Sequence, residues 1–505
     1  MSGYLIAHDL GTTGNKATLF TTDGELVDSV TMSYGTRFFQ DICAEQNPLD
    51  WWQAVCDSTK RLLKGKDSAL VRGIAFSGQM MGCVCVDKQG EPLRDAIIWA
   101  DQRSTEEAAQ LCKDIGAQEF YRITGHRPSP SYTIEKLMWV RSHQPELFAQ
   151  TYQCLQPKDY VIYKLTGNFV TDYTDASGTN AFDLDRLYWS ETIFQAAGLD
   201  PSIMPPVYPS THIAGGVLPE AAQACGLRPG TPVVIGGGDG CCATVGAAAI
   251  QPGVAYSYLG SSAWVSVTAE APILDPEMRT FNWAHIVPGL YVPMGTMQAA
   301  GNSFNFVRHQ MCKNLENQAV LEKTDVYSLI DRLASASPAG ANKLLFLPYP
   351  LGERSPRWNP EARGAFIGLK MEHTQGDLLR ATLEGILFNL KLILDVLQQS
   401  MPISRINLIG GLAQSPVQRR IMADIFGVDV CKLSCLEQAT SMGAAVTAGV
   451  GVGELSDFSA IHRFIHTDET LHPDPRQHQR YQQILPLFDK AYHQLEPVFH
   501  GLAQL

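Results

Sequence analysis

The 505-residue sequence predicts an α/β protein made of two similar halves. A chain of this length is too long for one compact core, so two large domains are expected. Segments with strand and helix patterns alternate along most of the chain, which is typical of α/β folds. A glycine–hydroxyl hairpin near the N-terminus has an echo in the second half, which suggests that the domain is duplicated.

The first half opens with three strand-like segments, followed by a helix. The helix is expected to begin at Pro48, with Asn47 as its N-cap, and to end at Gly65. Further on, two apolar strands flank the corner SGQMMG at residues 77–82, and helical patterns dominate residues 103–165. The three opening strands are expected at residues 4–9, 16–22 and 25–34.

Prolines crowd between residues 199 and 232 and indicate a boundary. The segment TPVVIGGGDGCCATVGAAAI follows, and it predicts a buried strand, a glycine turn and a small-residue helix. Later elements are expected at residues 254–260 and 262–268 (strands), 377–399 (a long amphipathic helix), 416–426 and 441–452 (helices). We expect a first domain over residues 1–248, a second over 249–455 and a helical tail over 456–505.

The composition is ordinary for a globular protein, with 45% hydrophobic and 18% charged residues. The formal net charge of −12 argues against a nucleic acid as partner, because a phosphate backbone requires a basic face. A small anionic ligand needs only a few local donors, so the acidic balance leaves a nucleotide open.

The twelve cysteines contain no pair of C-x-x-C units, so a thiolate metal site is not expected, and free thiols suit the reducing cytoplasm. His8 and Asp9 interrupt the first apolar run, which argues against a signal peptide. No apolar segment reaches about 18 residues, the length that a membrane span requires. We therefore expect a cytoplasmic protein that does not enter a membrane.

The first hairpin, YLIAHDLGTTGNKATLF, has the ingredients of a phosphate-binding loop. Gly11 exposes the backbone N–H groups of the loop, and the hydroxyls of Thr12 and Thr13 add donors for phosphate oxygens. Asp9 cannot approach a phosphate favourably without a cation between them, and Mg²⁺ is the natural bridge. The alternative is an ordinary hairpin whose hydroxyls satisfy its own turn. The echo VAYSYLGSSAWVSVT places Gly260 and Ser261 at a matching tip.

Asp239 follows three glycines at the carboxyl end of an apolar strand, where ligands bind in open α/β sheets. A carboxylate there can accept a proton from a substrate hydroxyl, or it can simply cap the next helix. Gly410 and Gly411 end another strand and would let a flat ligand such as adenosine approach, although tight helix–sheet packing is an equal alternative. The corners SGQMMG and WADQR could line a substrate pocket or belong to the core.

Several motifs, taken together and in order, resemble the FGGY family of carbohydrate kinases within the actin-like ATPase superfamily. The resemblance covers roughly residues 4–455. GAFIGLKMEHTQGDLLRATLEG fits the C-terminal signature of the family, and SYTIEKLMWVRSH nearly fits the N-terminal one, departing at Ser142. The other matching segments are GGGDGCC, LGSSAW, QAAGNSFNF, LPYPLGERSPRW and EQATSMGAAVTAG.

The resemblance implies two actin-like (ribonuclease H-like) domains, with ATP, Mg²⁺ and a sugar meeting in the cleft between them. It assigns the general base to Asp239 and the Mg²⁺ anchor, largely through water, to Asp9. The phosphates would lie against Gly11, Thr12, Thr13, Gly260 and Ser261, and the adenosine against Gly301, Gly410, Gly411 and Gln414. The sugar would lie against Gln79, Met80, Met81, Asp101, Asp239 and Gly240.

Within the family, SGQM-G, PLRDAIIWADQR, PKDYVIYKLTG and TDASGTNAFDL resemble the xylulokinase branch, which implies D-xylulose as substrate. That branch typically has histidine at the position of Met81, and a thioether cannot donate a hydrogen bond. A related ketose, polyol or deoxy sugar is therefore an alternative substrate. An actin-like ATPase or nucleotide-binding scaffold without sugar transfer is the alternative of another class. The oligomeric state stays open, with a homodimer as one expectation.

Overall fold

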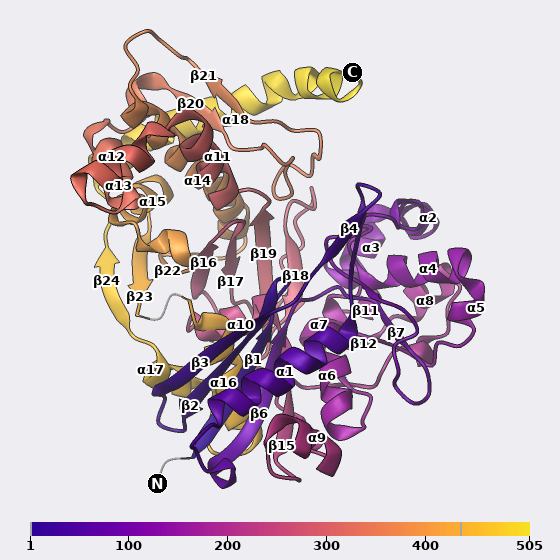
Figure 1. Cartoon of the computed structure of the whole chain (residues 1–505). Coiled ribbons are helices and arrows are strands. Elements are labelled where there is room, and N and C mark those ends of the chain that lie inside the picture. The colour runs from indigo at the N-terminus through magenta and orange to yellow at the C-terminus, as the bar shows by residue number, and fades with distance from the viewer. Residues whose placement is uncertain (1–2, 435–436) are drawn as a thin grey trace.

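The computed structural model describes residues 3–434 and 437–505, and these form two halves that each contain a mixed β-sheet with helices packed on it (Figure 1). This arrangement confirms the α/β class. The predicted helix at Pro48 is also confirmed as α1 (Pro48–Leu62), and the side chain of Asn47 caps it by accepting a hydrogen bond from the backbone N–H of Leu49.

The N-terminal sheet has six strands in the order β14-β15-β6-β1-β2-β3. The strands β1, β2 and β3 form an antiparallel meander, while β6 and β15 run parallel to β1. The antiparallel β14 closes the far edge. The bounds are β1 (Tyr4–Leu10), β2 (Gly14–Thr21), β3 (Leu26–Ser33), β6 (Val71–Gly78), β14 (Ile213–Gly216) and β15 (Pro232–Gly238).

The C-terminal sheet repeats this plan, with the order β18-β19-β17-β16-β22-β23-β24. Its strands β16, β17 and β19 form the meander, β22 and β23 run parallel to β16, and β24 is antiparallel at the edge. Six strands therefore correspond one to one between the halves, which confirms the predicted duplication. The bounds are β16 (Ala255–Leu259), β17 (Ala263–Val267), β18 (Phe281–Ala284), β19 (Tyr291–Met297), β22 (Arg405–Ile409), β23 (Asp429–Leu433) and β24 (Thr467–Leu471).

Two small-residue helices join the halves. Helix α10 (Asp239–Gly246) follows β15, and it packs against α16 (Ala439–Gly451), which itself lies on β1 and β6 of the N-terminal sheet. The helices approach each other closely because a glycine of each helix faces the backbone of the other helix. A Cβ on Gly246 would lie 1.7 Å from the carbonyl oxygen of Ala439, and one on Gly443 would lie 1.9 Å from that of Cys242. The second half therefore supplies part of the core beneath the first.

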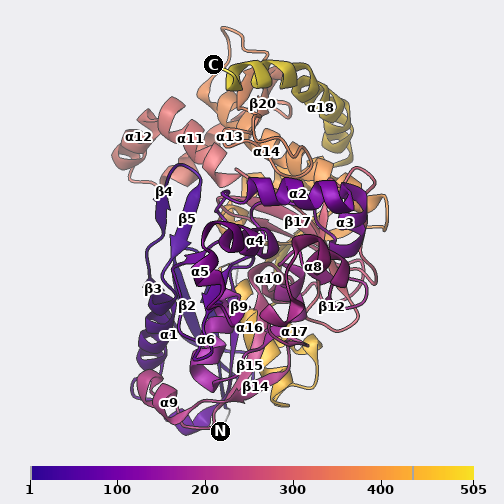
Figure 2. The same cartoon turned by 90° about the vertical axis from the view of Figure 1, so that its right-hand side faces the viewer.

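The N-terminal half also carries a helical region, in which α2, α4 and α8 pack together (Figure 2). The predicted helical stretch over residues 103–165 is interrupted by the short strand β9 (Gln153–Leu155), which pairs with β7 (Val84–Val86). The helices are α2 (Thr105–Ile115), α3 (Ala117–Thr124), α4 (Thr133–His143), α5 (Pro145–Phe148), α6 (Pro157–Thr166), α7 (Tyr173–Ser177), α8 (Glu191–Ala197) and α9 (Pro219–Cys225). Short strands also occur at β4 (Arg37–Phe39), β5 (Cys43–Gln46), β8 (Ala96–Ile97), β10 (Thr171–Asp172), β11 (Phe182–Asp183), β12 (Tyr188–Trp189) and β13 (Val207–Tyr208).

In the C-terminal half, the predicted helix over 416–426 matches α15 (Pro416–Phe426), and the long amphipathic helix is α14 (Gln375–Gln398). The remaining elements before residue 455 are α11 (Gly301–Met311), α12 (Asn314–Glu322), α13 (Val326–Ala336), β20 (Leu345–Leu347) and β21 (Ala365–Ile367). Across residues 3–434 and 437–505, no helix is both long and apolar enough to cross a membrane.

Residues 456–505, expected to be a helical tail, contribute a strand as well as helices. The strand β24 is the edge of the C-terminal sheet, and the helices are α17 (Ile461–Phe464) and α18 (Pro475–Ala503). The buried side chains of α18 belong to the hydrophobic core that surrounds α14. The end of the chain is thus packed onto the second half, as Figure 1 shows for the first part of α18.

Candidate active site

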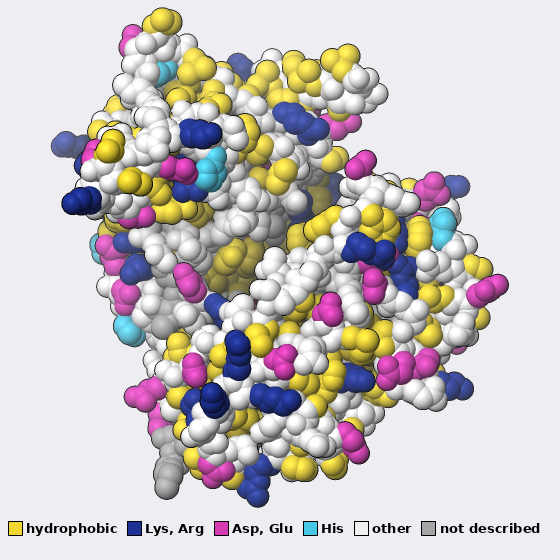
Figure 3. Space-filling model, in the orientation of Figure 1, with side chains coloured by type: hydrophobic (Ala, Val, Ile, Leu, Met, Phe, Trp, Pro, Cys, Tyr) yellow, Lys and Arg dark blue, Asp and Glu magenta, His cyan; other side chains and the backbone are white. Residues whose placement is uncertain are grey.

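The tip of the hairpin between β16 and β17 contributes residues to the walls of two cavities. Gly260 and Ser261 line the larger one, which has a volume of about 700 Å³. The next residue, Ser262, lines the smaller one, of about 180 Å³. Figure 3 shows the surface of the molecule hollowed between its two halves. Consecutive residues of a single turn therefore line both cavities.

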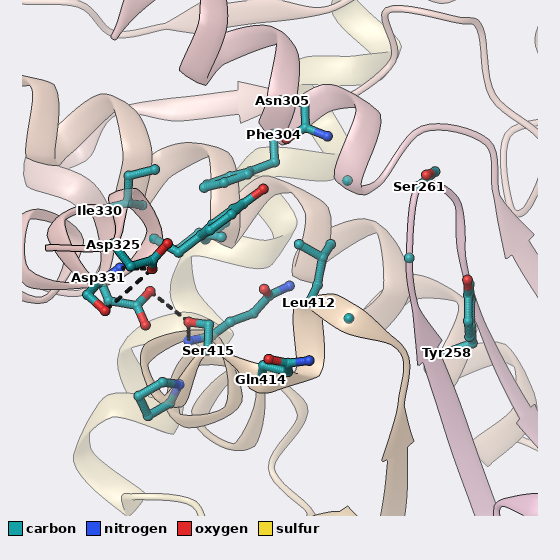
Figure 4. A pocket seen from close by; sticks show the side chains of 18 residues that line it. Tyr258, Ser261, Phe304, Asn305, Asp325, Ile330, Asp331, Leu412, Gln414 and Ser415 are labelled. Atoms are coloured by element: carbon teal, nitrogen blue, oxygen red, sulfur yellow. Dashed lines mark hydrogen bonds between the residues drawn. The ribbon is translucent and has the colours of Figure 1, made fainter. Parts of the chain in front are cut away.

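The larger cavity lies in the C-terminal half. Five residues predicted for the nucleotide line it: Gly260, Ser261, Gly301, Gly411 and Gln414. Figure 4 shows Ser261 at the hairpin tip on one side, Asp325 and Asp331 on the opposite side, and Leu412, Gln414 and Ser415 between them. The hydroxyl of Ser415 donates to Asp331 at 2.7 Å.

Gly410 lies behind this wall and shapes the turn. Its φ is +94°, and a Cβ there would lie 2.6 Å from the carbonyl oxygen of Leu259 in the neighbouring strand. A side chain would meet both backbone strain and a steric clash, so the end of β22 requires glycine at this position. By contrast, a Cβ on Gly411 would meet nothing within 4 Å, because this residue faces the open space.

The start of α11 holds the second hairpin through backbone hydrogen bonds. The N–H groups of Ala300 and Asn302 donate to the carbonyl oxygen of Ser261 at 3.0 and 3.1 Å, and that of Gly301 donates to Gly260 at 2.9 Å. A Cβ on Gly301 would lie only 2.6 Å from this same oxygen. The absence of a side chain at residue 301 is therefore what allows the hairpin tip and the helix to touch.

The smaller cavity brings together residues that are distant in sequence. Four of its lining residues were predicted for the substrate, namely Met80, Met81, Asp239 and Gly240. Met81 has a φ of +66°, a conformation uncommon outside glycine and asparagine, so the corner that presents it is strained. The other lining residues are Trp99, Ser262, Trp264, Phe281, Trp283, Met294, Thr296, Gln298 and Arg354.

Asp239 and Asp9 are two carboxylates at the site, and the charge of Asp9 acts on Asp239. Burial, and secondarily the charge of Asp9, raises the pKa of Asp239 to about 7, against an ordinary value of 3.8. Burial also raises the pKa of Asp9, to about 6, although a hydrogen bond from Ser77 and the charge of Lys16 act in the opposite direction. A carboxylate with a pKa near 7 can exchange a proton at neutral pH.

The first hairpin faces the site from the other half. Asp9 accepts a hydrogen bond from the hydroxyl of Ser77 at 2.9 Å. The hydroxyl oxygen of Thr12 accepts one from the indole N–H of Trp99 at 2.9 Å, which ties the loop to the wall of the smaller cavity. Lys16 donates to the backbone oxygen of Glu437 at 2.8 Å and so links the two halves.

Gly11 and Thr13 complete this loop. The backbone N–H of Gly11 donates to the carbonyl oxygen of Gly14 at 3.0 Å, and Thr13 is exposed at the tip. The loop residues Asp9, Gly11, Thr12 and Thr13 are not among those that line either cavity of the described structure. They approach the site through Asp9, whose charge acts on Asp239, and through the contact between Thr12 and Trp99.

Gln79 and Asp101, both predicted to contact the substrate, are turned into the protein. The amide nitrogen of Gln79 donates to the side chain of Gln46 at 2.7 Å. Asp101 is fully buried and accepts hydrogen bonds from the backbone N–H of Ala44 at 2.6 Å and from two guanidinium nitrogens of Arg103. Because its oxygens are already occupied, Asp101 supports the loop after Trp99 and does not line the cavity.

A divalent cation of the kind the motifs imply would find oxygen ligands at Asp9. Magnesium favours one or two carboxylates together with phosphate oxygens and water, and this donor set fits a single carboxylate beside a glycine–hydroxyl hairpin. Within residues 3–434 and 437–505, no group of three or more His, Cys, Asp or Glu side chains is arranged to hold a metal ion. Asp9 would therefore share such an ion with the nucleotide.

Most of the wall residues that sequence reasoning missed belong to segments whose motifs were recognised. Ser262 and Trp264 lie in LGSSAW, Trp99 in WADQR and Arg354 in LPYPLGERSPRW. Phe281 and Trp283 have no such signal, because strand β18 alternates as an ordinary buried strand would. Phe281 and Trp283 lie at the cavity because of how their strand pairs with its neighbour, and the sequence of the strand alone does not reveal this pairing.

The chain matches "FGGY family of carbohydrate kinases, N-terminal domain" over residues 4–246 and "FGGY family of carbohydrate kinases, C-terminal domain" over residues 255–452. A gluconokinase of Bacillus subtilis is 30% identical over 505 residues, which cover 100% of this chain and 98% of that protein. A xylulose kinase of Escherichia coli is 32% identical over 496 residues, which cover 98% of this chain and 99% of that protein. These matches agree with the resemblance that the motifs indicate.

Solved structures of carbohydrate kinases have a similar fold over their full length. The gluconate kinase from Lactobacillus acidophilus superposes with a TM-score of 0.92 at 28% identity, covering 99% of this chain and 100% of the other. The xylulose kinase from Rhodospirillum rubrum has a TM-score of 0.90 at 29% identity, covering 98% of this chain and 100% of the other. Similar full-length folds thus occur in proteins named for two different substrates.

Proposed function

The chain belongs to the FGGY family of carbohydrate kinases, and we propose that it transfers the γ-phosphoryl group of ATP to a hydroxyl of a ketopentose such as D-xylulose. One observation carries the proposal. Asp239 lines a small cavity, and consecutive residues of the hairpin tip at 260–262 line both this cavity and a cavity large enough for a nucleotide.

In this proposal Asp239 is the general base. It accepts the proton of the sugar hydroxyl that attacks the γ-phosphorus, and the raised pKa of about 7 suits this role at neutral pH. Phosphoryl transfer asks a protein mainly for positioning and for neutralisation of charge. Closure of the cleft around the sugar would exclude water and limit hydrolysis of ATP.

The nucleotide would occupy the larger cavity. We assign the phosphates to the two hairpin tips, at Gly11, Thr12 and Thr13 on one side and Gly260 and Ser261 on the other. The adenosine would lie against Gly301, Gly411 and Gln414, with Gly410 shaping the turn behind them. Asp9 would hold a Mg²⁺ ion through water, and this ion would supply positive charge that neutralises the phosphates.

The walls of the smaller cavity suit a short sugar. Aromatic faces such as Trp264 and Trp283 can pack against the C–H face of a sugar, while Gln298 provides hydrogen-bonding groups for hydroxyls. The cavity of about 180 Å³ is smaller than the roughly 300 Å³ at which drug-sized sites begin, so a small acceptor is favoured. Met81 gives the sugar no hydrogen-bond donor.

A six-carbon sugar acid such as gluconate is the second candidate. Arg354 brings a positive charge to the cavity, with its guanidinium carbon 5.6 Å from the ring centre of Phe281 and 5.9 Å from that of Trp358. A guanidinium group binds a carboxylate in bidentate geometry, which a neutral ketose cannot reproduce. Relatives named gluconokinase favour this candidate in the same way that relatives named xylulose kinase favour the first.

A coupled assay of ADP formation tests the proposal with D-xylulose, D-ribulose, xylitol, 1-deoxy-D-xylulose and D-gluconate. We expect ADP formation to depend on added sugar, with the highest kcat/KM for D-xylulose. A preference for gluconate that the Arg354→Met variant loses would instead support the second candidate. ADP formation that no sugar changes would contradict sugar transfer and leave an ATPase.

The Met81→His variant is measured beside the wild type, since histidine tolerates a positive φ and restores a donor. If wild type already prefers D-xylulose and the variant gains nothing, the contact at residue 81 is unimportant.

The Asp239→Ala variant should bind ATP normally while its turnover falls by about 10²- to 10⁴-fold. Near-normal turnover would exclude Asp239 as the base.

A further inference from the structure

We propose that Thr174 is a positioning residue for Asp239: its hydroxyl holds the backbone that carries this carboxylate, in an orientation set by Asp172 and Lys158. All three of these residues are fully buried behind the site. The inference rests on the proposed role of Asp239 as the general base. It assigns a purpose to a buried ionic cluster that the proposed mechanism does not otherwise use.

The segment before Asp239 consists of three glycines and needs support from outside. Gly236 has a φ of +76°, and a Cβ on Gly237 would lie 2.9 Å from the hydroxyl oxygen of Thr174. Without side chains, this backbone approaches α7 closely enough for the N–H of Gly238 to donate to Thr174 Oγ1 at 2.8 Å. Since Gly238 directly precedes Asp239, this bond fixes where α10 and its first side chain begin.

Thr174 can accept that bond because its own proton points elsewhere. Its hydroxyl donates to Asp172 Oδ2 at 2.6 Å, and an ionised carboxylate can only accept. The hydroxyl of Ser210 and the backbone N–H of Thr174 donate to the same oxygen at 2.7 and 2.9 Å. Because Asp172 can only accept, the hydroxyl of Thr174 donates to Asp172 and accepts from the backbone N–H of Gly238.

The other oxygen of Asp172 is also surrounded by donors. It accepts the ammonium group of Lys158 at 2.9 Å and the backbone N–H of Asp175 at 3.4 Å. An asparagine at residue 172 would therefore direct its NH₂ group at a donor in either orientation of the amide. The Asp172→Asn change, although isosteric, should disturb the network more than the loss of one bond does.

Lys158 supplies the positive charge that a buried Asp172 needs. Its ammonium nitrogen lies 2.7 Å from Asp159, 2.9 Å from Asp172 and 3.1 Å from Asp175. All these side chains are fully buried, so water does not screen the interaction. Lys158 also packs under the end of β6, because a Cβ on Gly78 would lie 3.0 Å from its own Cβ.

The test is steady-state kinetics of Thr174→Val, with the sugar that the panel identifies. Valine keeps the shape of threonine and removes the hydroxyl. We expect kcat to fall by about 10- to 100-fold, because displacement of a reacting group by a fraction of an ångström is costly, while the KM for ATP stays within about twofold. Thr174→Ser should restore kcat to within about threefold, and Asp172→Asn should lower it more than Thr174→Val does.

Thr382→Val is the matched control, since the hydroxyl of Thr382 is equally buried and bonds within α14 to the carbonyl of Leu378 at 2.7 Å. It should keep the wild-type kcat. The inference is overturned if Thr174→Val keeps a wild-type kcat, if the control loses as much, or if kcat and ATP affinity fall together. Asp239→Asn is run in parallel: if it is inactive while Thr174→Val is normal, only this inference fails, whereas an active Asp239→Asn variant overturns the base assignment and this inference with it.

Discussion

Asp239 is the residue whose protonation should control the rate. Its pKa of about 7 means that roughly half of the free enzyme has the base in its ionised form at neutral pH. Only the ionised carboxylate can accept the proton of the sugar hydroxyl, so kcat/KM for the sugar should rise about tenfold per pH unit below 7 and level off above 8. A profile measured from pH 5.5 to 9 at saturating ATP checks this. A flat profile would contradict the assignment, and Asp9, with its pKa of about 6, would add a second acidic step.

The same carboxylate should cost stability at alkaline pH. Its pKa is about 7 in the folded state against 3.8 for an ordinary aspartate, so the folded protein binds the proton more tightly. The stability that this gives at low pH is lost as the pH rises from about 4 to 7. Asp239→Asn should therefore unfold at a higher temperature than wild type at pH 8, and the difference should shrink at pH 5.

Asp101→Asn is the matched control in this thermal unfolding series. Asp101 is ion-paired with Arg103, 2.7 Å away, so removing its charge leaves the buried guanidinium with only Glu45, 2.8 Å away, to balance it. This variant should be less stable than wild type at both pH values. If Asp239→Asn is destabilised to the same extent at pH 8, the ionised carboxylate of Asp239 does not lower the stability of the folded protein.

At the scale of elements, the contact between α11 and the second phosphate hairpin should set the affinity for ATP. Gly301→Ala would place a Cβ 2.6 Å from the carbonyl oxygen of Gly260 and push the hairpin tip away from the helix. We expect the KM for ATP to rise about tenfold, which is about 1.4 kcal/mol of lost binding, with the KM for the sugar nearly unchanged. Gly501→Ala, in open space on α18, is the control and should behave as wild type.

Strong local patterns predicted their elements well. The two hairpins, α15 and the strand before Asp239 follow directly from periodicity and glycine placement. Strand β24 was missed because its sequence, TDETL, is polar and partly exposed at a sheet edge, so it carries no hydrophobic alternation. The aromatic wall of the smaller cavity was missed for another reason: Phe281 and Trp283 line the same cavity as Asp239 because of long-range packing, which a short stretch of sequence does not reveal.

At the scale of the whole molecule, Asp101 and Gln79 line neither cavity, and their contact with a sugar stays a prediction. Both are polar residues in irregular corners, which in sequence look like ligand positions. The fold uses them to hold those corners, through Arg103 and Gln46. Asp239 has the same sequence character, and what separates it is its place beside the junction of two duplicated halves, facing the charge of Asp9.

Helix α18 packs into the core of the second half, and loss of this packing should destabilise that half. Phe488 in α18 is fully buried in the core around α14, whereas its neighbour Leu487 is 58% exposed. Phe488→Ala should cost about 3–5 kcal/mol, because it leaves a cavity in a packed core, while Leu487→Ala should change stability by less than about 0.5 kcal/mol. Urea unfolding followed by fluorescence and by ATP binding measures both. Equal midpoints for the two variants would mean that α18 only covers the surface, whereas a shift confined to Phe488→Ala would make residues beyond 455 part of the folded core of the second half.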